Sequence, residues 1–353
     1  MSRKPDTPLR RGWTTGACAT AATRAALMML WGEGQPEKIR ITLPRGERPD
    51  FAIAHAKQGA GWAEVGIVKD AGDDPDVTHQ ALIIARVQAS LEGVRFVAGD
   101  GVGTVTKPGL PIPPGEAAIN PVPRQMMRET VQEMAKRLGQ KPDIQITISV
   151  PNGAEIAQKT WNPRLGIKGG LSILGTTGIV RPFSCAAWIA SIHRGVDVAR
   201  AEGLRHVAGC TGATSEKVVR HLHALPEQAM LDMGDFVGGL LKYIARHPVE
   251  RVTIGGGIGK ITKLAQGARD LHSGRSQVNF ETVADWMENP ALAHCNTALQ
   301  AYEIAGKPFA EVVSQRALRE VQKMLPDGSI CDIVVIDRAG TILAQAGPSE
   351  DPS

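Results

Sequence analysis

From about residue 144 onward, short apolar runs alternate with helical segments, and most of the runs end in a glycine-rich turn. The clearest runs are IQITISV (144–150), GLSILG (170–175), RHVAG (205–209), RVTIGG (251–256) and CDIVVID (331–337). Strands joined by helical crossovers make a mostly parallel sheet with helices against its faces. The pattern therefore predicts a Rossmann-like α/β domain over residues 141–347, followed by a flexible tail at residues 348–353.

The residues before this domain follow a different pattern. A helix rich in alanine and leucine is expected over residues 17–31, and short strands separated by Gly and Pro turns follow it. Residues 107–124 contain six prolines, which exclude regular structure, so this segment is predicted to be a linker or a rigid binding loop. A second helix is expected over residues 125–138. We therefore predict an α+β domain over residues 1–140 and assign the whole chain to the α/β class.

Charge, cysteine content and hydropathy exclude several classes of protein. The 40 Lys and Arg residues nearly balance the 36 Asp and Glu residues, whereas a nucleic-acid binder needs a concentrated basic face. The five cysteines are an odd number without a CxxC pair, which fits neither a disulfide framework nor a cysteine zinc site. No apolar run reaches the roughly 18 residues that span a membrane. We expect a cytoplasmic protein, monomeric or homodimeric, without nucleic-acid or membrane partners and without a bound metal.

Five loops are expected at the carboxyl ends of the predicted strands, where open α/β sheets bind their ligands. They are residues 151–153, 175–178, 209–216, 232–235 and 255–260. Glycine lets backbone amides approach a ligand at a helix N-terminus, although each loop alone is also explained by a tight turn. The loop GGGIGK is followed by Ile261, where a Walker A loop needs Ser or Thr, so ATP hydrolysis of the P-loop type is not expected. Five loops at one edge favour a small-molecule site.

An acidic segment, DAGDDPDVTH at residues 70–79, follows a predicted strand. Crowded carboxylates can raise the pKa of one member and create a general base, or they can hold a cation. The same residues are also typical of a turn in which side chains bond their own backbone. Both interpretations stay open for Asp73, Asp74 and the neighbouring His79.

Histidines supply the other candidate groups. His272, in the sequence DLHSG beyond Lys260 and Lys263, lies near the edge of the predicted site and is a candidate acid or base. His221 and His223 are two residues apart on a predicted helix, so their side chains point to different sides. That pair therefore does not predict a metal site.

Six longer segments have distinctive sequences: RRGWTTGACATAATRAA, VKDAGDDPDVTH, GVGTVTKPGLPIPPGEAAINPVPR, VPNGAEIAQKTWNPRLGIKGGLSILGTTGIVRP, DMGDFVGGLLK and GGGIGKITKLAQGARDLHS. In order, from about Leu9 to at least Ser276, they resemble the CbiD family. The resemblance implies an N-terminal α+β domain and a C-terminal Rossmann-like domain. It also implies transfer of the methyl group of S-adenosyl-L-methionine to ring carbon 1 of a ring-contracted cobalt corrinoid in cobalamin biosynthesis.

The reaction that the resemblance implies gives roles to residues of these loops. Methyl transfer from a sulfonium needs alignment and exclusion of water rather than a metal or a covalent nucleophile. For the adenosyl donor, the expected contacts are Gly175, Thr176, Thr177, Gly178, Gly209, Gly212, Glu216 and Asp235. For the carboxylates of the tetrapyrrole substrate, the expected cations are Lys107, Arg124, Lys260 and Lys263. For the proton that methylation makes labile, the catalytic candidates are Asp73, Asp74, His79 and His272.

Two alternatives have different requirements. A non-catalytic corrinoid-binding protein of the same pathway would need the basic cleft but no adenosyl pocket. A nucleotide-dependent enzyme would use the glycine-rich loops for phosphate, which the failed Walker spacing disfavours. Binding of S-adenosyl-L-homocysteine would support methyl transfer and count against both alternatives.

Overall fold

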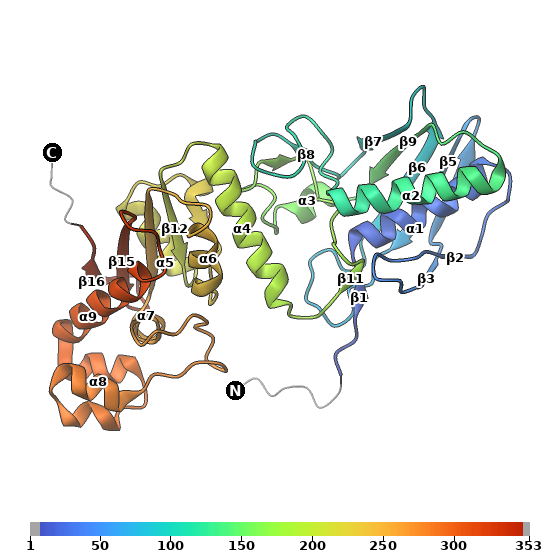
Figure 1. Ribbon diagram of the computed structural model, residues 1–353. Helices are drawn as coiled ribbons and strands as arrows, with labels where there is room; N and C mark the ends of the chain where they lie inside the picture. Colours follow the sequence, from blue (N-terminus) through green and yellow to red (C-terminus); the bar gives the residue numbers. More distant parts are fainter. Residues whose placement is uncertain (1–7, 349–353) are drawn as a thin grey trace. The chain divides into compact units, whose positions relative to one another are not determined.

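The computed structural model describes residues 8–348 and forms two compact units, Met1–Cys185 and Ala186–Ser353. Each unit has its own sheet (Figure 1). Each of these sheets has five strands, and each unit has its own buried core. The α/β class predicted from the sequence is confirmed. The division lies at residue 185, whereas the sequence predicted it at residue 140.

The sheet of the first unit explains this later division. Its strands, in the order in which they lie, are β4 (His55–Gly59), β5 (Trp62–Val68), β6 (Leu82–Ala89), β9 (Ile144–Ser149) and β7 (Val94–Ala98). Strand β9 was expected to open the second domain, but it pairs antiparallel with β6 and parallel with β7. Ile144, Ile146 and Ile148 of β9 alternate with polar residues and are buried in the first core. These contacts keep β9 in the first unit.

Two helices, α1 (Thr15–Leu30) and α2 (Pro121–Leu138), lie side by side across this sheet (Figure 1). Thirteen of the sixteen residues of α1 are buried, and its many alanines let the sheet and α2 approach it closely. Arg24 of α1 donates two hydrogen bonds, of 2.9 and 2.8 Å, to the carboxylate of Glu133 on α2. The helix predicted over residues 17–31 is confirmed.

The proline-rich segment 107–124 is not a linker between the domains. Pro121 and Pro123 lie in the first turn of α2, where a backbone N–H has no helical partner and proline is tolerated. Further upstream, Ile112 is buried with Val105 and Ile167 in a small apolar cluster. The segment is therefore a packed loop of the first unit that ends in a helix.

The other elements of the first unit are short. They are β1 (Gly12–Trp13), β2 (Lys38–Arg40), β3 (Asp50–Ala52), β8 (Thr104–Val105), α3 (Gly153–Ala157), β10 (Ile167–Lys168) and β11 (Ile179–Val180). The strands among them pair as β1 with β11, β2 with β3, and β8 with β10. The prediction of a strand at residues 170–175 is wrong, since this segment forms only isolated β-bridges, at Leu171 and Ile173.

The sheet of the second unit is mostly parallel, as the alternation of strands and helices predicted. Its strands, in the order in which they lie, are β13 (Met230–Leu231), β12 (His206–Cys210), β14 (Arg251–Gly257), β15 (Ile330–Ile336) and β16 (Ile342–Ala346). The first four are parallel, and β16 runs antiparallel to β15. The predicted tail begins at Pro348, and its residues 349–353 lie outside the part of the chain that the structure describes.

Helices cover both faces of this second sheet. The helices of this part of the chain are α4 (Cys185–Ala201), α5 (Ala213–Leu222), α6 (Val237–Ile244), α7 (Ile258–Ala265), α8 (Phe280–Met287) and α9 (Ala298–Gln322), with short 3₁₀ turns η1 (Glu227–Ala229) and η2 (Pro290–His294). Ala208 and Cys210 pack towards α5, whereas Val207 belongs to the core shared with α6, α7 and α9. Helix α9 is kinked at Gly306, two residues before Pro308. Among residues 8–348, we find no helix that is long and apolar enough to cross a membrane.

Candidate functional site

A pocket of about 620 Å³ lies in the second unit, at the carboxyl ends of β12, β14 and β15. This is the edge at which open α/β sheets bind ligands. Its apolar lining includes Ile258, Val278, Phe280, Leu299 and Ile336. The volume falls in the range of sites for small molecules and cofactors, about 300–1,000 Å³.

Three helices, α5, α7 and α9, begin at this pocket. The N-caps of α5 and α7 are Gly212 and Gly257, which carry no side chain that could accept from the first-turn amides. A Cβ atom on Gly212 would meet no heavy atom within 4 Å, and on Gly257 or Gly259 the nearest would be 4.0 Å away. These glycines border open space. The helix N-termini therefore offer backbone N–H groups to an anionic or polar ligand group.

Charged residues frame the same pocket. Lys260 pairs with Asp235, and Nζ of Lys263 donates to the backbone oxygen of Leu271 at 3.0 Å. Burial lowers the pKa of Lys263, although the charge of Asp235 opposes this effect. Both lysines line the pocket.

Asp337 and Arg338 also line the pocket, and neither was predicted from the sequence. The backbone N–H of Thr341 donates to Oδ1 of Asp337 at 2.8 Å and lowers the pKa of this carboxyl group. Asp337 is therefore ionised at neutral pH. Both residues directly follow a buried parallel strand, so the rule used for the other loops could have found them.

Three of the five loops expected to converge on one sheet edge do so, and two do not. Residues 209–216, 232–235 and 255–260 follow strands of the second sheet, whereas 151–153 and 175–178 belong to the first unit. The expectation of five converging loops is wrong, because residues 144–180 contribute no strand to the second sheet as described.

The expected donor contacts of the second unit have different surroundings. Gly212 lines the pocket. Gly209 lies within β12, where a Cβ atom would stand 2.4 Å from Leu240, so close packing explains this glycine. Glu216 lies on α5, just beyond the pocket-lining residues 211–215. Asp235 forms an ion pair with Lys260.

The GTTG turn at residues 175–178 packs against the N-terminus of α1. A Cβ atom would lie 2.4 Å from Oγ1 of Thr14 if added to Gly175 and 2.5 Å from Leu43 if added to Gly178. The carbonyl of Gly178 accepts from the N–H of Thr14 at 3.0 Å. Between the glycines, Oγ1 of Thr177 accepts from the N–H of Ile179 at 3.2 Å, and Thr176 is exposed. These contacts give the turn a packing role.

The carboxylates of the acidic segment 70–79 accept hydrogen bonds from the protein. Asp73 accepts from the N–H of Arg10 at 2.6 Å, and Asp74 accepts from the N–H of Phe183 at 2.8 Å. His79 accepts at Nδ1 from the N–H of Ala71 at 3.0 Å. The contacts are those of a turn that binds neighbouring chain segments.

Asp76, in the same segment, shows how these carboxylates are stabilised. It accepts from Nζ of Lys69 at 2.7 Å, and the Lys69 side chain is 1% exposed. Burial alone would raise the pKa of Asp76, but the charge of Lys69 and the hydrogen bonds from Lys69 and Thr78 lower it. The direction is opposite to the raised pKa that a general base at neutral pH requires.

The other predicted cations and the fourth catalytic candidate lie elsewhere. Arg124 donates to Glu116 at 2.5 Å and to the carbonyls of Ile119 and Ala117 at 2.8 and 2.9 Å, and its side chain is 12% exposed. Lys107 lies against Gly166 in the first unit. His272 is exposed and accepts at Nδ1 from the N–H of Gly274 in a turn. Lys107 and Arg124 thus have their contacts within the first unit, and His272 is not among the residues that line the pocket.

Comparison with known proteins gives matches along nearly the whole chain. The CbiD family model matches residues 2–182, and the model of the CbiD C-terminal domain matches residues 270–347. A cobalt-precorrin-5B C(1)-methyltransferase of Paramagnetospirillum magneticum is 54% identical over 350 residues, covering 96% of this chain and 98% of its own. Proteins of the same name from Brucella anthropi and Methylorubrum extorquens are 55% and 53% identical.

One solved structure also matches. It is the crystal structure of the cobalamin biosynthesis protein CbiD from Archaeoglobus fulgidus, with 26% sequence identity and a TM-score of 0.41. The match covers 84% of this chain and 85% of that one. The first family model spans half of the chain, and the bacterial relatives are more than 50% identical over nearly its full length. This protein belongs to the CbiD family.

Proposed function

We propose that this protein transfers the methyl group of S-adenosyl-L-methionine to carbon 1 of cobalt-precorrin-5B, a step of cobalamin biosynthesis in the cytoplasm. One observation carries the proposal: the curated relatives with 53–55% identity over at least 95% of both chains have this activity as their name. The cobalt of this reaction belongs to the substrate.

The donor binds, in this proposal, in the pocket at the carboxyl edge of the second sheet. The amides of the first turns of α5 and α7 suit the carboxylate of the methionine part. The ionised Asp337 suits the ribose hydroxyls, because a carboxylate accepts hydrogen bonds from both. The apolar lining, which includes Val278 and Phe280, suits the adenine ring.

The reaction is a displacement at the sulfonium methyl carbon. An electron pair of ring carbon 1 forms the new carbon–carbon bond, and the carbon–sulfur bond breaks with its electrons remaining on sulfur as S-adenosyl-L-homocysteine leaves. The protein needs to align donor and acceptor and to exclude water. The carboxylates of the substrate need cations near the donor, and Lys260 at the pocket suits this role because its side chain is 38% exposed.

A single-turnover experiment tests the activity. The full chain is mixed with cobalt-precorrin-5B and a donor whose methyl group carries carbon-13, and the product is examined by mass spectrometry and NMR. We expect one labelled methyl group, bound to carbon 1. A protein that binds the substrate but neither transfers the label nor binds S-adenosyl-L-homocysteine is the non-catalytic carrier instead.

A substitution tests the donor site. Asp337→Asn removes the charge but keeps the size of the side chain, and a charge-assisted hydrogen bond contributes about 1.5–3 kcal/mol. We expect calorimetry to show at least about 10-fold weaker binding of S-adenosyl-homocysteine. The matched control is Asp327→Asn, an exposed residue shortly before β15. Equal affinity in both variants would mean that the ribose lies elsewhere.

A further inference from the structure

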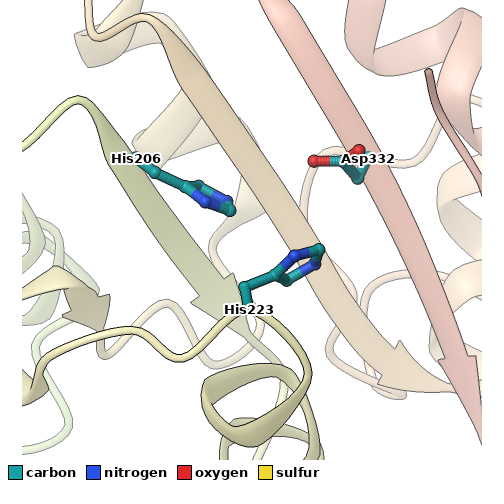
Figure 2. Close-up of side chains that lie close together, drawn as sticks. All are labelled: His206, His223 and Asp332. Carbon is teal, nitrogen blue, oxygen red and sulfur yellow. The ribbon is translucent and has the colours of Figure 1, made fainter. Parts of the chain in front are cut away.

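Three side chains that commonly bind metal ions meet at the amino edge of the second sheet. His206 opens β12, Asp332 is the third residue of β15, and His223 directly follows α5. One ligand atom of each lies within 4.8 Å of those of the other two. Figure 2 shows both imidazole rings and the carboxylate turned towards one space. Among residues 8–348, this is the group of histidine, cysteine and acidic side chains whose geometry suits a metal ion.

The sheet itself brings two of these residues together. In the register of the strands, Thr253 of β14 lies between Ala208 of β12 and Asp332 of β15. His206 stands two residues before Ala208, so both side chains project from the same face as Thr253. His223 closes the group from the end of α5, the helix that packs on this face. These residues lie far apart in the sequence, and the strand register together with the packing of α5 on the sheet brings them close.

Hydrogen bonds orient two of the three ligands. Oγ1 of Thr253 lies 2.8 Å from Nε2 of His206 and 3.1 Å from Oδ2 of Asp332. Thr253 is fully buried, and its hydroxyl therefore holds the imidazole and the carboxylate in fixed positions. Outer-shell hydrogen bonds of this kind hold metal ligands in place in known metal sites.

Charge limits the strength of such a site and favours certain ions. Arg251 donates to Asp332 through Nε at 2.7 Å and Nη2 at 3.1 Å, so the carboxylate is already balanced. With Thr253, these bonds use three of the roughly four acceptor directions of a carboxylate, and a cation takes the fourth. Two neutral imidazoles and a balanced carboxylate suit a borderline transition-metal ion better than Ca²⁺ or Mg²⁺, which prefer several oxygen ligands. We expect micromolar rather than nanomolar affinity.

We infer that His206, His223 and Asp332 form a binding site for one divalent transition-metal ion of the zinc type. Both histidines are half-buried, so water completes the coordination. The ion ties the end of α5 to β12 and β15. The other end of α5, at residues 213–215, lines the pocket, so the bound ion steadies the helix that offers its amides there. The inference does not depend on the proposed reaction, and it replaces the sequence expectation of a protein without a bound metal.

Zinc titration of the metal-free full chain tests the site. We expect isothermal calorimetry to give one equivalent of Zn²⁺ with micromolar affinity. His206→Ala and His223→Ala should each weaken this binding by at least about 10-fold, since loss of even an outer-shell partner costs that much. The matched control is His221→Ala, an exposed histidine two residues earlier on α5, which should bind as the wild type does. Binding that is absent in the wild type, or equal in all three variants, overturns the inference.

Two further measurements keep the test decisive if the alanine variants fold poorly. Saturating Zn²⁺ should raise the melting temperature of the wild type by roughly 5–10 °C, as expected for a ligand at about 100 times its Kd, and it should not do so for His223→Gln. Co²⁺ bound to the wild type should give weak visible bands from nitrogen and oxygen ligands. An intense thiolate charge-transfer band would instead assign the ion to a cysteine such as Cys210 and overturn the inference.

Discussion

Two glycines that close similar turns, Gly178 in GTTG of the first unit and Gly212 in GCTG of the second, have opposite surroundings. A Cβ atom on Gly178 would lie 2.5 Å from Leu43, at a backbone φ of +81°. A Cβ atom on Gly212 would meet no heavy atom within 4 Å, and Gly212 lines the pocket. Glycine in the first turn permits close packing of the chain on itself, whereas glycine in the second leaves room for a ligand. The same residue type therefore marks two different functions.

This difference extends beyond the glycines. The acidic segment of the first unit uses its carboxylates to hold the chain, as the contacts of Asp73, Asp74 and Asp76 show. In the second unit, Asp337 and Lys260 border a cavity. The loops of the first unit are thus expected to respond to substitution through stability, and those at the pocket through ligand binding. Substitutions in both units test this contrast.

The largest effect is expected for Asp76→Asn. The substitution leaves the buried ammonium of Lys69 without its counter-charge, and breaking a buried pair in this way costs about 3–5 kcal/mol. Because Asp76 is 24% exposed, we expect the lower end, a fall of roughly 6–12 °C in the melting temperature. The double variant Lys69→Met, Asp76→Asn removes the stranded charge and should recover part of the loss. No recovery would show that the pair is not the cause.

The same pair gives a pH dependence. The folded-state pKa of Asp76 is lowered, so its stabilising contribution is complete above the unfolded pKa of about 3.9 and is lost as the pH falls through the lower folded value. The difference in stability between the wild type and Asp76→Asn should therefore be constant above about pH 5 and shrink below about pH 4. A difference that persists at low pH would contradict this account.

Gly178→Val tests the packing of the GTTG turn in the first unit. Valine at positive φ is strained, and its side chain overlaps Leu43; overpacking alone costs about 1–3 kcal/mol. We expect a melting temperature lower by roughly 2–12 °C, with unchanged affinity of the folded fraction for S-adenosyl-homocysteine. A donor contact at Gly178, as expected from the sequence, would instead give loss of donor binding with an intact fold. Calorimetry and thermal unfolding on one preparation decide between them.

Gly212→Val is the counterpart at the pocket. The backbone at Gly212 is extended and has space for a side chain, so the expected cost is that of a poorer N-cap, about 1 kcal/mol or less. The side chain fills the mouth of the pocket, and we expect about 100-fold weaker binding of S-adenosyl-homocysteine, or about 2.7 kcal/mol. Gly212→Ala should give an intermediate loss. If Gly212→Val instead lowered the melting temperature and left the affinity for S-adenosyl-homocysteine unchanged, the two turns would not differ in function.

Local patterns in the sequence predicted what local physics decides. The alanine-rich run at residues 17–31 had the composition of a helix packed on several sides, and it forms α1. The alternation after residue 200 predicted a parallel sheet, because a helical crossover constrains strand direction. The run at residues 144–150 was correctly expected to be a strand, but it was assigned to the wrong sheet. A strand with alternating isoleucines pairs with any suitable edge, and the choice depends on distant residues.

The site was harder to predict for the same reason. Gly209 and Gly212 are three residues apart, and only the positions of Leu240 and the pocket distinguish a packed glycine from an open one. Asp337 directly follows β15, but the strand expected at residues 331–337 included it, so the strand-end rule did not single it out. His206, His223 and Asp332 meet through the strand register and the packing of α5 on the sheet, which a single sequence does not reveal.

The smallest effect is expected for Asp74→Asn, and it tests whether the acidic segment takes part in the reaction. Oδ1 of Asp74 accepts from the N–H of Phe183 at 2.8 Å, and the amide oxygen of asparagine can accept the same bond. We therefore expect a melting temperature within about 2 °C of the wild type and a single-turnover rate within about 2-fold. Asp74→Ala loses the bond and should cost about 1 kcal/mol, or roughly 2–4 °C, again without a change in rate. A fall of about 10²- to 10⁴-fold in the rate of Asp74→Asn, with both ligands still bound, is what loss of a general base would give. That result would move part of the chemistry into the first unit, and its loops could no longer be described as packing alone.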